Sequence, residues 1–189
     1  MKVVGISGSL RRNSHNTAAL RAAIELAPLG MVIETAEIGD LPHYNDDIRQ
    51  AGYPPQVERL RGQLSSADAI LFATPEYNYS IPGVLKNAID WASRPPSQPF
   101  ECKPVAIMGA SLGVLGTARA QYQLRQMLVY LDAHPINKPE VMIGQAGAKF
   151  DEQGRLTDEP TRDFIRQMLV SLATWTRRLE ARPTQMAAE

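Results

Sequence analysis

The stretch Val3–Thr17, VVGISGSLRRNSHNT, decides the fold of this chain of 189 residues. Its apolar beginning, Val3–Ile6, predicts a buried strand, and the residues 18–26 predict a helix. A short turn rich in glycine, serine, arginine and asparagine separates the two. The start of a helix attracts anions, because its first backbone N–H groups are unpaired and carry a partial positive charge. The stretch therefore predicts a strand, a tight turn and a helix start that is suited to an anion.

The side chains of this turn predict a binding site for a phosphate group. They offer hydroxyl and amide donors together with arginine charge, from Ser7, Ser9, Arg11, Arg12, Ser14, Asn16 and Thr17. The Gly-x-Gly-x-x-Gly and Walker patterns are both absent from the turn. A site made mainly of hydroxyl and backbone groups suits a terminal monophosphate, and flavin mononucleotide (FMN) is the first candidate. The alternative is an ordinary polar turn between a strand and a helix.

Composition indicates one globular domain, because 44% of the residues are hydrophobic and 21% are charged. With 20 basic and 20 acidic residues the formal net charge is zero, which gives no electrostatic reason to expect nucleic acid or an acidic membrane as a partner. No apolar run approaches the roughly 20 residues that span a bilayer, and no signal-peptide core is found. We therefore expect a cytoplasmic protein with one domain over 1–182 and a disordered tail over 183–189.

The chain offers few side chains that bind metals. Cys102 is its only cysteine, which excludes an intrachain disulfide and a multi-cysteine metal site. Its histidines, His15, His43 and His134, are scattered without helical pairing. We therefore predict no metal site and interpret Cys102 as a passive thiol, with a reactive thiol as the alternative.

Strand-like apolar runs alternate with helical patterns along the chain. Strands are predicted at 2–7, 31–38, 69–74, 105–109 and 137–142, and helices at about 15–27, 55–66, 83–92, 116–132 and 160–178. Such alternation predicts right-handed crossovers and helices on both faces of a parallel sheet. The fold class is therefore α/β, a flavodoxin-like three-layer sandwich with a five-stranded parallel sheet of order 2-1-3-4-5. Pro139 suits an edge strand, and 39–54 is predicted to be an ordered loop near the site or an interface.

Ligands of such a sheet bind outside the carboxyl ends of its strands, so the loops after the first, third and fourth strands should converge. Prolines stiffen the loop 74–83, and its backbone, Asn78 and Tyr77 suit the mixed polar and apolar edges of a flavin. Glycines in the loop 109–117 let the backbone approach a planar ligand. Each loop also has a purely structural interpretation. In 74–83, Tyr77 would pack against the loop and Glu76 would hold it in place by a hydrogen bond or an ion pair. In 109–117, the glycines would form a hinge at the end of a strand.

The three loops together resemble a known family. The resemblance is carried by GSLRRNSHNT (8–17), TPEYNYSIPGVLKNAIDW (74–91) and GASLGVLGTARAQYQLRQ (109–126). On these blocks the chain resembles the NAD(P)H-dependent FMN reductase family of the flavodoxin-like superfamily, and within it the bacterial quinone and chromate reductases. The resemblance implies that Ser9, Arg11, Ser14, Asn16 and Thr17 hold the FMN phosphate, that Pro75, Glu76, Tyr77 and Asn78 line its ring, and that Ser111 and Gly113 approach the ring from the other side. It also implies a homodimer or homotetramer.

The implied activity is hydride transfer from NADPH or NADH to N5 of the flavin, followed by electron transfer to a quinone. The flavin carries the chemistry, so no catalytic side chain is predicted, and the order of events predicts ping-pong kinetics. Free flavin, azo compounds and chromate are further possible acceptors. One alternative is a flavodoxin-like electron carrier without its own NAD(P)H oxidation, which the balanced charge argues against. Another is a partner-binding module without redox turnover.

Overall fold

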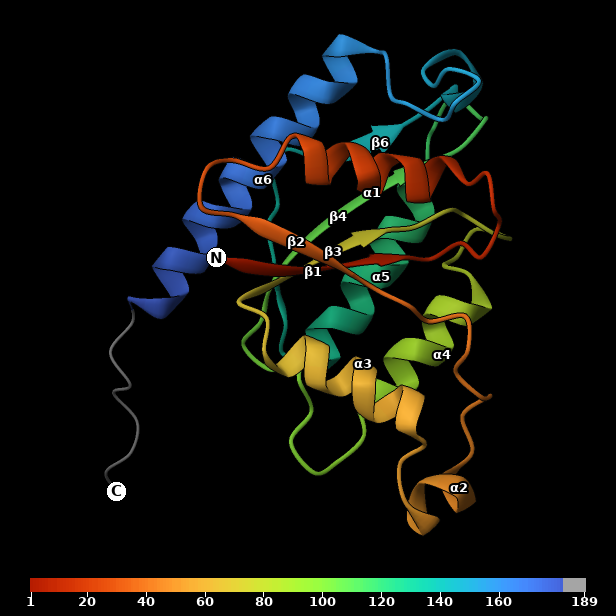
Figure 1. Ribbon diagram of the computed structural model, residues 1–189, viewed down its shortest axis with the longest axis vertical. Helices are drawn as coiled ribbons and strands as arrows, with labels where there is room; N and C mark the ends of the chain where they lie inside the picture. Colours follow the sequence, from red (N-terminus) through yellow and green to blue (C-terminus); the bar gives the residue numbers. More distant parts are fainter. Residues whose placement is uncertain (182–189) are drawn as a thin grey trace.

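A computed structural model describes residues 1–181 and shows a parallel sheet between two layers of helices (Figure 1). The strands are β1 (Lys2–Ser7), β2 (Val32–Ala36), β3 (Ala69–Ala73), β4 (Pro104–Ala110), β5 (His134–Pro135) and β6 (Val141–Ile143). The helices are α1 (His15–Glu25), α2 (Asp46–Ala51), α3 (Pro55–Ser65), α4 (Gly83–Ala92), α5 (Ala118–Tyr130) and α6 (Glu159–Glu180), with a short 3-10 helix at Ala146–Ala148. The predicted tail, 183–189, lies outside the described residues.

The strand order is β2-β1-β3-β4-β5, with β6 also paired to β4, and this confirms the predicted flavodoxin-like sandwich. Helices α1 and α6 pack on one face of the sheet, and α3, α4 and α5 pack on the other (Figure 1). Alternate residues of β1 enter the two cores, Val3 on the side of α1 and Val4 on the side of α3. Every residue of β3 is buried, as expected for a central strand that is covered on both faces. Among the described residues, no helix is long and apolar enough to cross a bilayer.

The predicted edge strand at 137–142 is wrong in its extent. Two shorter strands replace it: β5 pairs with the beginning of β4, where His134 lies opposite Pro104, and β6 pairs with its end, where Ile143 lies opposite Ala110. The chain leaves the sheet between the two strands. Pro139 lies in that interval, and a proline has no N–H group to donate to a ladder.

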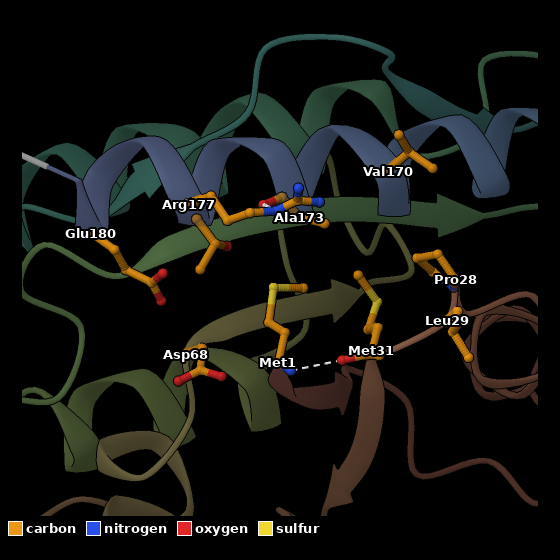
Figure 2. Close-up of a pocket in the computed structure, with 11 residues that line it drawn as sticks. Met1, Pro28, Leu29, Met31, Asp68, Val170, Ala173, Arg177 and Glu180 are labelled. Atoms are coloured by element: carbon orange, nitrogen blue, oxygen red, sulfur yellow. Dashed lines mark hydrogen bonds between the residues drawn. The ribbon is translucent and has the colours of Figure 1, made fainter.

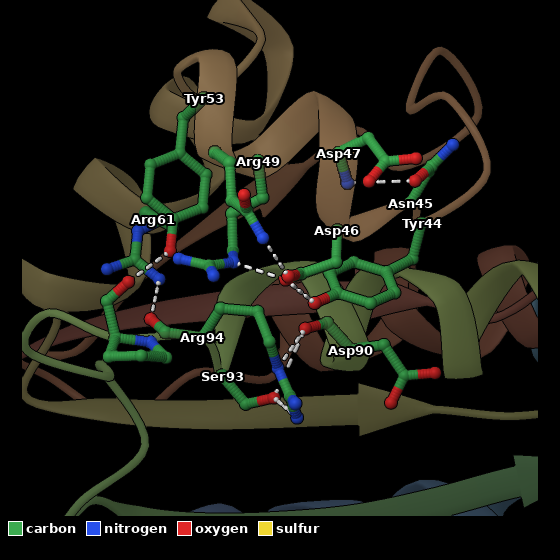
Figure 3. Close-up of polar contacts among 12 residues, drawn as sticks. Tyr44, Asn45, Asp46, Asp47, Arg49, Tyr53, Arg61, Asp90, Ser93 and Arg94 are labelled. Atoms are coloured by element: carbon green, nitrogen blue, oxygen red, sulfur yellow. Dashed lines mark hydrogen bonds and ion pairs between the residues drawn. The ribbon is translucent and has the colours of Figure 1, made fainter.

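The segment 39–54 is not only a loop, because it contains the short helix α2. The side chain of Asn45 caps the helix by accepting a hydrogen bond from the N–H of Asp47 at 2.9 Å, and Gly52 ends it with φ 127°. Figure 3 shows the Asp46 carboxylate accepting hydrogen bonds from Arg49 and from the hydroxyl of Tyr44. These polar contacts compensate for the absence of buried residues in α2.

Polar and aromatic contacts fix the same segment against α3 and α4. Arg61 donates hydrogen bonds to the carbonyls of Ala92 and Arg94, at 2.6 and 2.7 Å, and its guanidinium lies 4.4 Å from the centre of the Tyr53 ring (Figure 3). The indole of Trp91 is fully buried and donates to the carbonyl of Pro42 at 2.7 Å. The long connection after β2 is therefore ordered by side chains that belong to the two helices beneath it.

Gly109 on β4 gives a direct test of how tightly the end of the sheet is packed. A Cβ atom at this position would overlap the hydroxyl oxygen of Thr117 and the carbonyl oxygen of Thr74. We expect Gly109→Ala to lower the free energy of unfolding by about 1–3 kcal/mol, measured by urea denaturation. Gly62→Ala is the matched control, since a Cβ on this exposed position of α3 would meet no atom within 4 Å. That control should gain up to about 1 kcal/mol from helix propensity, and equal stability of both variants would contradict the packing argument.

Candidate functional site

The loops after β1, β3 and β4 leave the sheet side by side. The parallel register sets Ser7 beside Ala73 and Ala73 beside Met108, so β1 and β3 end at the same level and β4 continues two residues further, to Ala110. The N–H of Gly8 donates to the carbonyl of Ala73 at 2.9 Å, and the N–H of Thr74 donates to the carbonyl of Met108 at 3.0 Å. The loops predicted to converge therefore begin from neighbouring points on the carboxyl edge of the sheet.

Asn16 joins the first loop to the end of β4. Its side-chain N–H donates to the carbonyl of Ala110 at 2.9 Å, and its side-chain oxygen accepts from the N–H of the same residue at 2.8 Å. The side chain is buried, with 3% of Asn16 exposed. The sequence places Asn16 among the phosphate donors, whereas in the structure its amide is committed to the backbone of Ala110. Asn16 therefore links the first loop to the start of the third loop.

Ser14 caps helix α1 at the centre of the first loop. Its hydroxyl accepts hydrogen bonds from the backbone N–H groups of Asn16 and Thr17, at 3.2 and 3.4 Å. The hydroxyl of Thr17 lies 2.8 Å from that of Ser7, which ends β1. Hydroxyl groups thus surround the positive end of α1, a helix of 11 residues, where an anion is stabilised.

Arg11 brings positive charge to the same loop and is exposed. Its guanidinium donates to the carbonyl of Asn13 at 2.7 Å, and its N–H donates to the hydroxyl of Ser9 at 3.3 Å. Burial, and then the positive charge of Arg11, lower the pKa of His15. The imidazole of His15 is therefore neutral at pH 7, so Arg11 and not His15 supplies charge from this part of the loop.

The second loop forms a tight hairpin turn. Tyr77 and Ser80 exchange backbone hydrogen bonds of 2.9 and 3.0 Å, while Asn78 and Tyr79 between them both have positive φ angles, of 51° and 67°. Two central residues with positive φ are the mark of a type I′ turn, in which asparagine is favoured. The turn leaves the Tyr77 side chain outside the core, with 52% of the residue exposed.

Glu76 clamps the second loop to the start of α5. One carboxylate oxygen accepts hydrogen bonds from the N–H groups of Arg119 and Ala120, at 3.0 and 3.2 Å. The other lies 2.5 Å from the guanidinium of Arg119, and only 7% of the Glu76 side chain is exposed. The same guanidinium stacks 3.8 Å from the centre of the Tyr79 ring. The sequence carries no signal for the pairing of Glu76 with Arg119, because the two residues are 43 positions apart, although a helix start favours a carboxylate such as that of Glu76.

The third loop is held by its own carbonyl groups and by β6. The hydroxyl of Ser111 donates to the carbonyl of Gly116 at 2.5 Å, and the carbonyl of Gly113 accepts from the N–H of Gln145 at 3.0 Å. The loop exposes apolar side chains, with Leu112 70% and Val114 75% exposed. Predicted ring-contacting residues of this loop therefore lie beside an apolar surface that is open to a ligand.

A separate cavity of about 530 Å³ lies at the other edge of the sheet, beside the amino ends of β1 and β3 and the end of α6 (Figure 2). Its lining is mixed, with the apolar side chains of Met1, Leu29, Met31 and Val170 and the charged side chains of Asp68, Arg177 and Glu180. Sheets of this type bind their cofactors at the carboxyl ends of the strands. This cavity is therefore distinct from the loop site.

Comparison with known proteins agrees with the geometry of the loops. The model of the family described as NADPH-dependent FMN reductase matches residues 1–148. The chain belongs to this family. The resemblance drawn from the three loops is thereby confirmed, and FMN is the cofactor with NAD(P)H as the co-substrate of an enzyme.

Relatives match over nearly the whole chain. An NAD(P)H-dependent FMN reductase of Pseudomonas aeruginosa is 64% identical, over 95% of this chain and 97% of the relative. A quinone reductase of Escherichia coli is 45% identical, over 95% and 97% of the two chains. The solved structure of a flavoenzyme NAD(P)H:(acceptor) oxidoreductase from Paracoccus denitrificans has a TM-score of 0.85 at 38% identity and covers 94% of this chain and 97% of its own.

The residues at the loop site suit FMN. A phosphate needs donors and positive charge, and the start of α1 offers hydroxyl groups, the helix dipole and Arg11 in one place. A flavin ring needs an apolar and aromatic surface, and the exposed side chains of Tyr77, Leu112 and Val114 provide one on the other two loops. Asn16 and Glu76 hold these loops in place by contacts that require no ligand.

Substitution of Asn16 tests its role as the link between the first and third loops. Asn16→Ala removes both partners of the Ala110 backbone groups, and leaving two buried polar groups unpaired costs about 2–5 kcal/mol. We expect this loss of unfolding free energy in urea denaturation of the variant. Asn13→Ala is the control in the same loop, because only the backbone carbonyl of Asn13 is used there. A stability of Asn16→Ala within about 0.5 kcal/mol of the wild type would refute the role.

Proposed function

We propose that this enzyme oxidises NADPH or NADH through its bound FMN and passes the electrons to quinones. One observation carries the proposal. At the carboxyl edge of the sheet, the positive start of α1 lies beside the loops after β3 and β4, and these two loops expose aromatic and apolar side chains. One side of this arrangement suits a phosphate and the other suits a planar ring. The open ring side leaves room for a second planar molecule.

The names of several relatives support quinones as acceptors. A relative from Arabidopsis thaliana named NADPH:quinone oxidoreductase is 47% identical over 96% of this chain, and the Escherichia coli relative is a quinone reductase. A quinone is flat and apolar, with two carbonyl oxygens that accept hydrogen bonds. Such a molecule fits a site edged by Tyr77, Asn78 and the exposed Leu112. Free flavin, azo compounds and chromate are proposed as secondary acceptors.

We assign different roles to the predicted site residues. Those that bind the phosphate directly are Ser9, Arg11, Ser14 and Thr17, and those that face the ring are Pro75, Tyr77, Asn78, Ser111 and Gly113. Asn16 and Glu76 act as positioning residues, because their polar atoms bond Ala110, Arg119 and Ala120. The oxygen and nitrogen of the Asn16 amide and both carboxylate oxygens of Glu76 already have protein partners. The hydroxyls of Ser14, Thr17 and Ser111 also contact the protein, but a hydroxyl both donates and accepts, so each keeps capacity for a ligand.

The protein contributes binding and orientation, and no side chain acts as a nucleophile. FMN, when bound, supplies the hydride acceptor and the electron donor of the reaction. Nicotinamide and quinone would both have to enter beside the exposed side chains of Tyr77 and Leu112, so the oxidised nicotinamide would leave before the quinone binds. The kinetics are therefore of the ping-pong type.

We also infer that the protein forms homodimers or homotetramers. Helix α5 carries exposed large side chains on one stretch, with Tyr122 54%, Val129 78% and Tyr130 84% exposed. Exposed apolar groups of this size, close together on one helix, are typical of surfaces that associate. Glu76 contacts the start of α5, near Tyr122, whereas Val129 and Tyr130 lie at the other end of the helix, so only the Tyr122 end of this surface is close to the loop site.

The proposed reaction can be followed by absorbance. Under anaerobic conditions NADPH should bleach the flavin of the purified protein, because the nicotinamide gains direct access to the ring, and added benzoquinone should restore the colour. Steady-state rates against NADPH at several quinone concentrations should give parallel double-reciprocal lines, as two half-reactions require.

Two outcomes would count against the proposal. A yellow protein that keeps its colour with NADPH and NADH, but bleaches with dithionite, is an electron carrier of the flavodoxin kind. A protein that purifies colourless and takes up no FMN is a binding module without redox turnover. Intersecting lines would keep the activity and reject only the ping-pong order.

Arg11 gives a test of the phosphate site. A hydrogen bond to a charged group contributes about 1.5–3 kcal/mol, so Arg11→Ala should weaken FMN binding by roughly 10- to 100-fold. The dissociation constant is measured by titrating FMN into the apoprotein and following the quenching of flavin fluorescence. Arg178→Ala is a matched control, because it removes the same charge from the far end of α6. Unchanged affinity in Arg11→Ala would remove Arg11 from the site.

A further inference from the structure

Cys102, Asp132 and His134 come together at the amino end of β4, on the edge of the sheet opposite the FMN site. The sulfur, a carboxylate oxygen and a ring nitrogen of these residues all lie within 4.8 Å of one another. We propose that they form a binding site for a thiophilic divalent cation of the zinc type. The proposal concerns a second site and does not depend on the function of the first.

The spacing of the ligand atoms suits a tetrahedral ion. Zinc bonds to thiolate sulfur at about 2.3 Å and to carboxylate oxygen at about 2.1 Å, which sets two such ligands about 3.6 Å apart in a tetrahedron. The Cys102 sulfur lies 3.6 Å from a carboxylate oxygen of Asp132. Rotation of the exposed Cys102 and Asp132 side chains toward the half-buried His134 is therefore enough to close the site around a cation.

The backbone beneath the cluster is fixed before any ion binds. The N–H of Cys102 donates to the carbonyl of Asp132 at 2.8 Å, and the N–H of His134 donates to the carbonyl of Lys103 at 2.8 Å. The carbonyl of His134 accepts from the indole of Trp175 at 3.0 Å. Binding then has to order only three side chains, and the loss of conformational entropy is small.

The surroundings of the cluster favour a cation. Cys102 and His134 line a cavity of about 560 Å³, together with the acidic residues Asp68, Glu101 and Glu180. Lys103 also lines this cavity, but its ammonium donates to the carbonyl of Ala67 at 2.6 Å. Three acidic residues and one engaged lysine give the cavity a net negative charge.

The ligand set selects among cations. Thiolate and imidazole groups prefer zinc and similar borderline or soft ions, whereas magnesium and calcium prefer oxygen ligands alone. Three protein ligands leave one tetrahedral position open to water or to a small anion. The chain therefore offers a partly exposed site and not the closed four-ligand type of a zinc finger.

The cluster revises the expectation of no metal site. That expectation rested on spacing along the sequence, where Cys102 and Asp132 are 30 residues apart. The parallel pairing of β4 with β5 brings His134 opposite Pro104, and thereby close to the turn that carries Cys102. Sequence spacing does not contain this proximity.

Isothermal titration calorimetry with zinc chloride tests the proposal. The protein is used untagged and loaded with FMN, after treatment with a chelator and desalting. We expect one saturable site per chain, which magnesium chloride does not occupy. Cys102→Ser, Asp132→Asn and His134→Gln should each lower the affinity for zinc about tenfold or more. His43→Gln is the matched control, since this exposed histidine lies outside the cluster.

Protection of the thiol provides a second measurement. Cys102 is the only cysteine, so alkylation by iodoacetamide reports on this residue alone, and zinc should slow it in the wild type. In Asp132→Asn and His134→Gln the same zinc concentration should protect less. Absence of saturable zinc binding by the wild type, or wild-type affinity in all three variants, would overturn the proposal. The flavin absorbance of each variant verifies that it is folded.

Discussion

Two hydrogen bonds between the side chain of Asn16 and the backbone of Ala110 join the first and third loops at the end of the sheet. The residues are 94 positions apart in sequence, so the contact forms only when β1, α1 and β4 are all in place. Both backbone groups of Ala110 lie in a buried position and need partners. Because one amide satisfies both groups, the start of α1 takes a fixed position relative to the strand that it crosses.

A second constraint acts on the remaining loop. The carboxylate of Glu76 accepts the N–H groups that open α5, and Arg119 balances its charge while stacking on Tyr79. The type I′ turn that carries Tyr77 and Asn78 is thus anchored at its base. Together with the Asn16 contact, this clamp fixes all three loops by contacts within the protein, as is usual for cofactor sites. Binding energy is then available for holding FMN and is not needed to assemble the loops.

Structural features that depend on neighbouring residues could be predicted from the sequence, whereas features that depend on distant partners could not. The bounds of β1 and α4 agree with the predicted 2–7 and 83–92, because apolar runs and a proline-led helix start are short-range patterns. Helix α2 was missed, since it buries no residue and has no apolar period, although its Asn45 cap and Gly52 stop are visible in the sequence. The predicted site residues lie in the three loops and in the first turn of α1, but the contacts of Asn16 and Glu76 depend on partners 94 and 43 positions away.

The divided outer edge of the sheet has a consequence for how copies of this chain can meet. A strand added from outside needs a continuous row of free backbone groups, and β5 and β6 offer only two and three residues on either side of a break. Short, interrupted edges of this kind resist cross-chain pairing and the growth of extended sheets. On this side of the molecule, a second copy of the chain therefore cannot extend the sheet by pairing a strand with it. Contact here is made through side-chain surfaces, whose shape can limit the number of copies that associate.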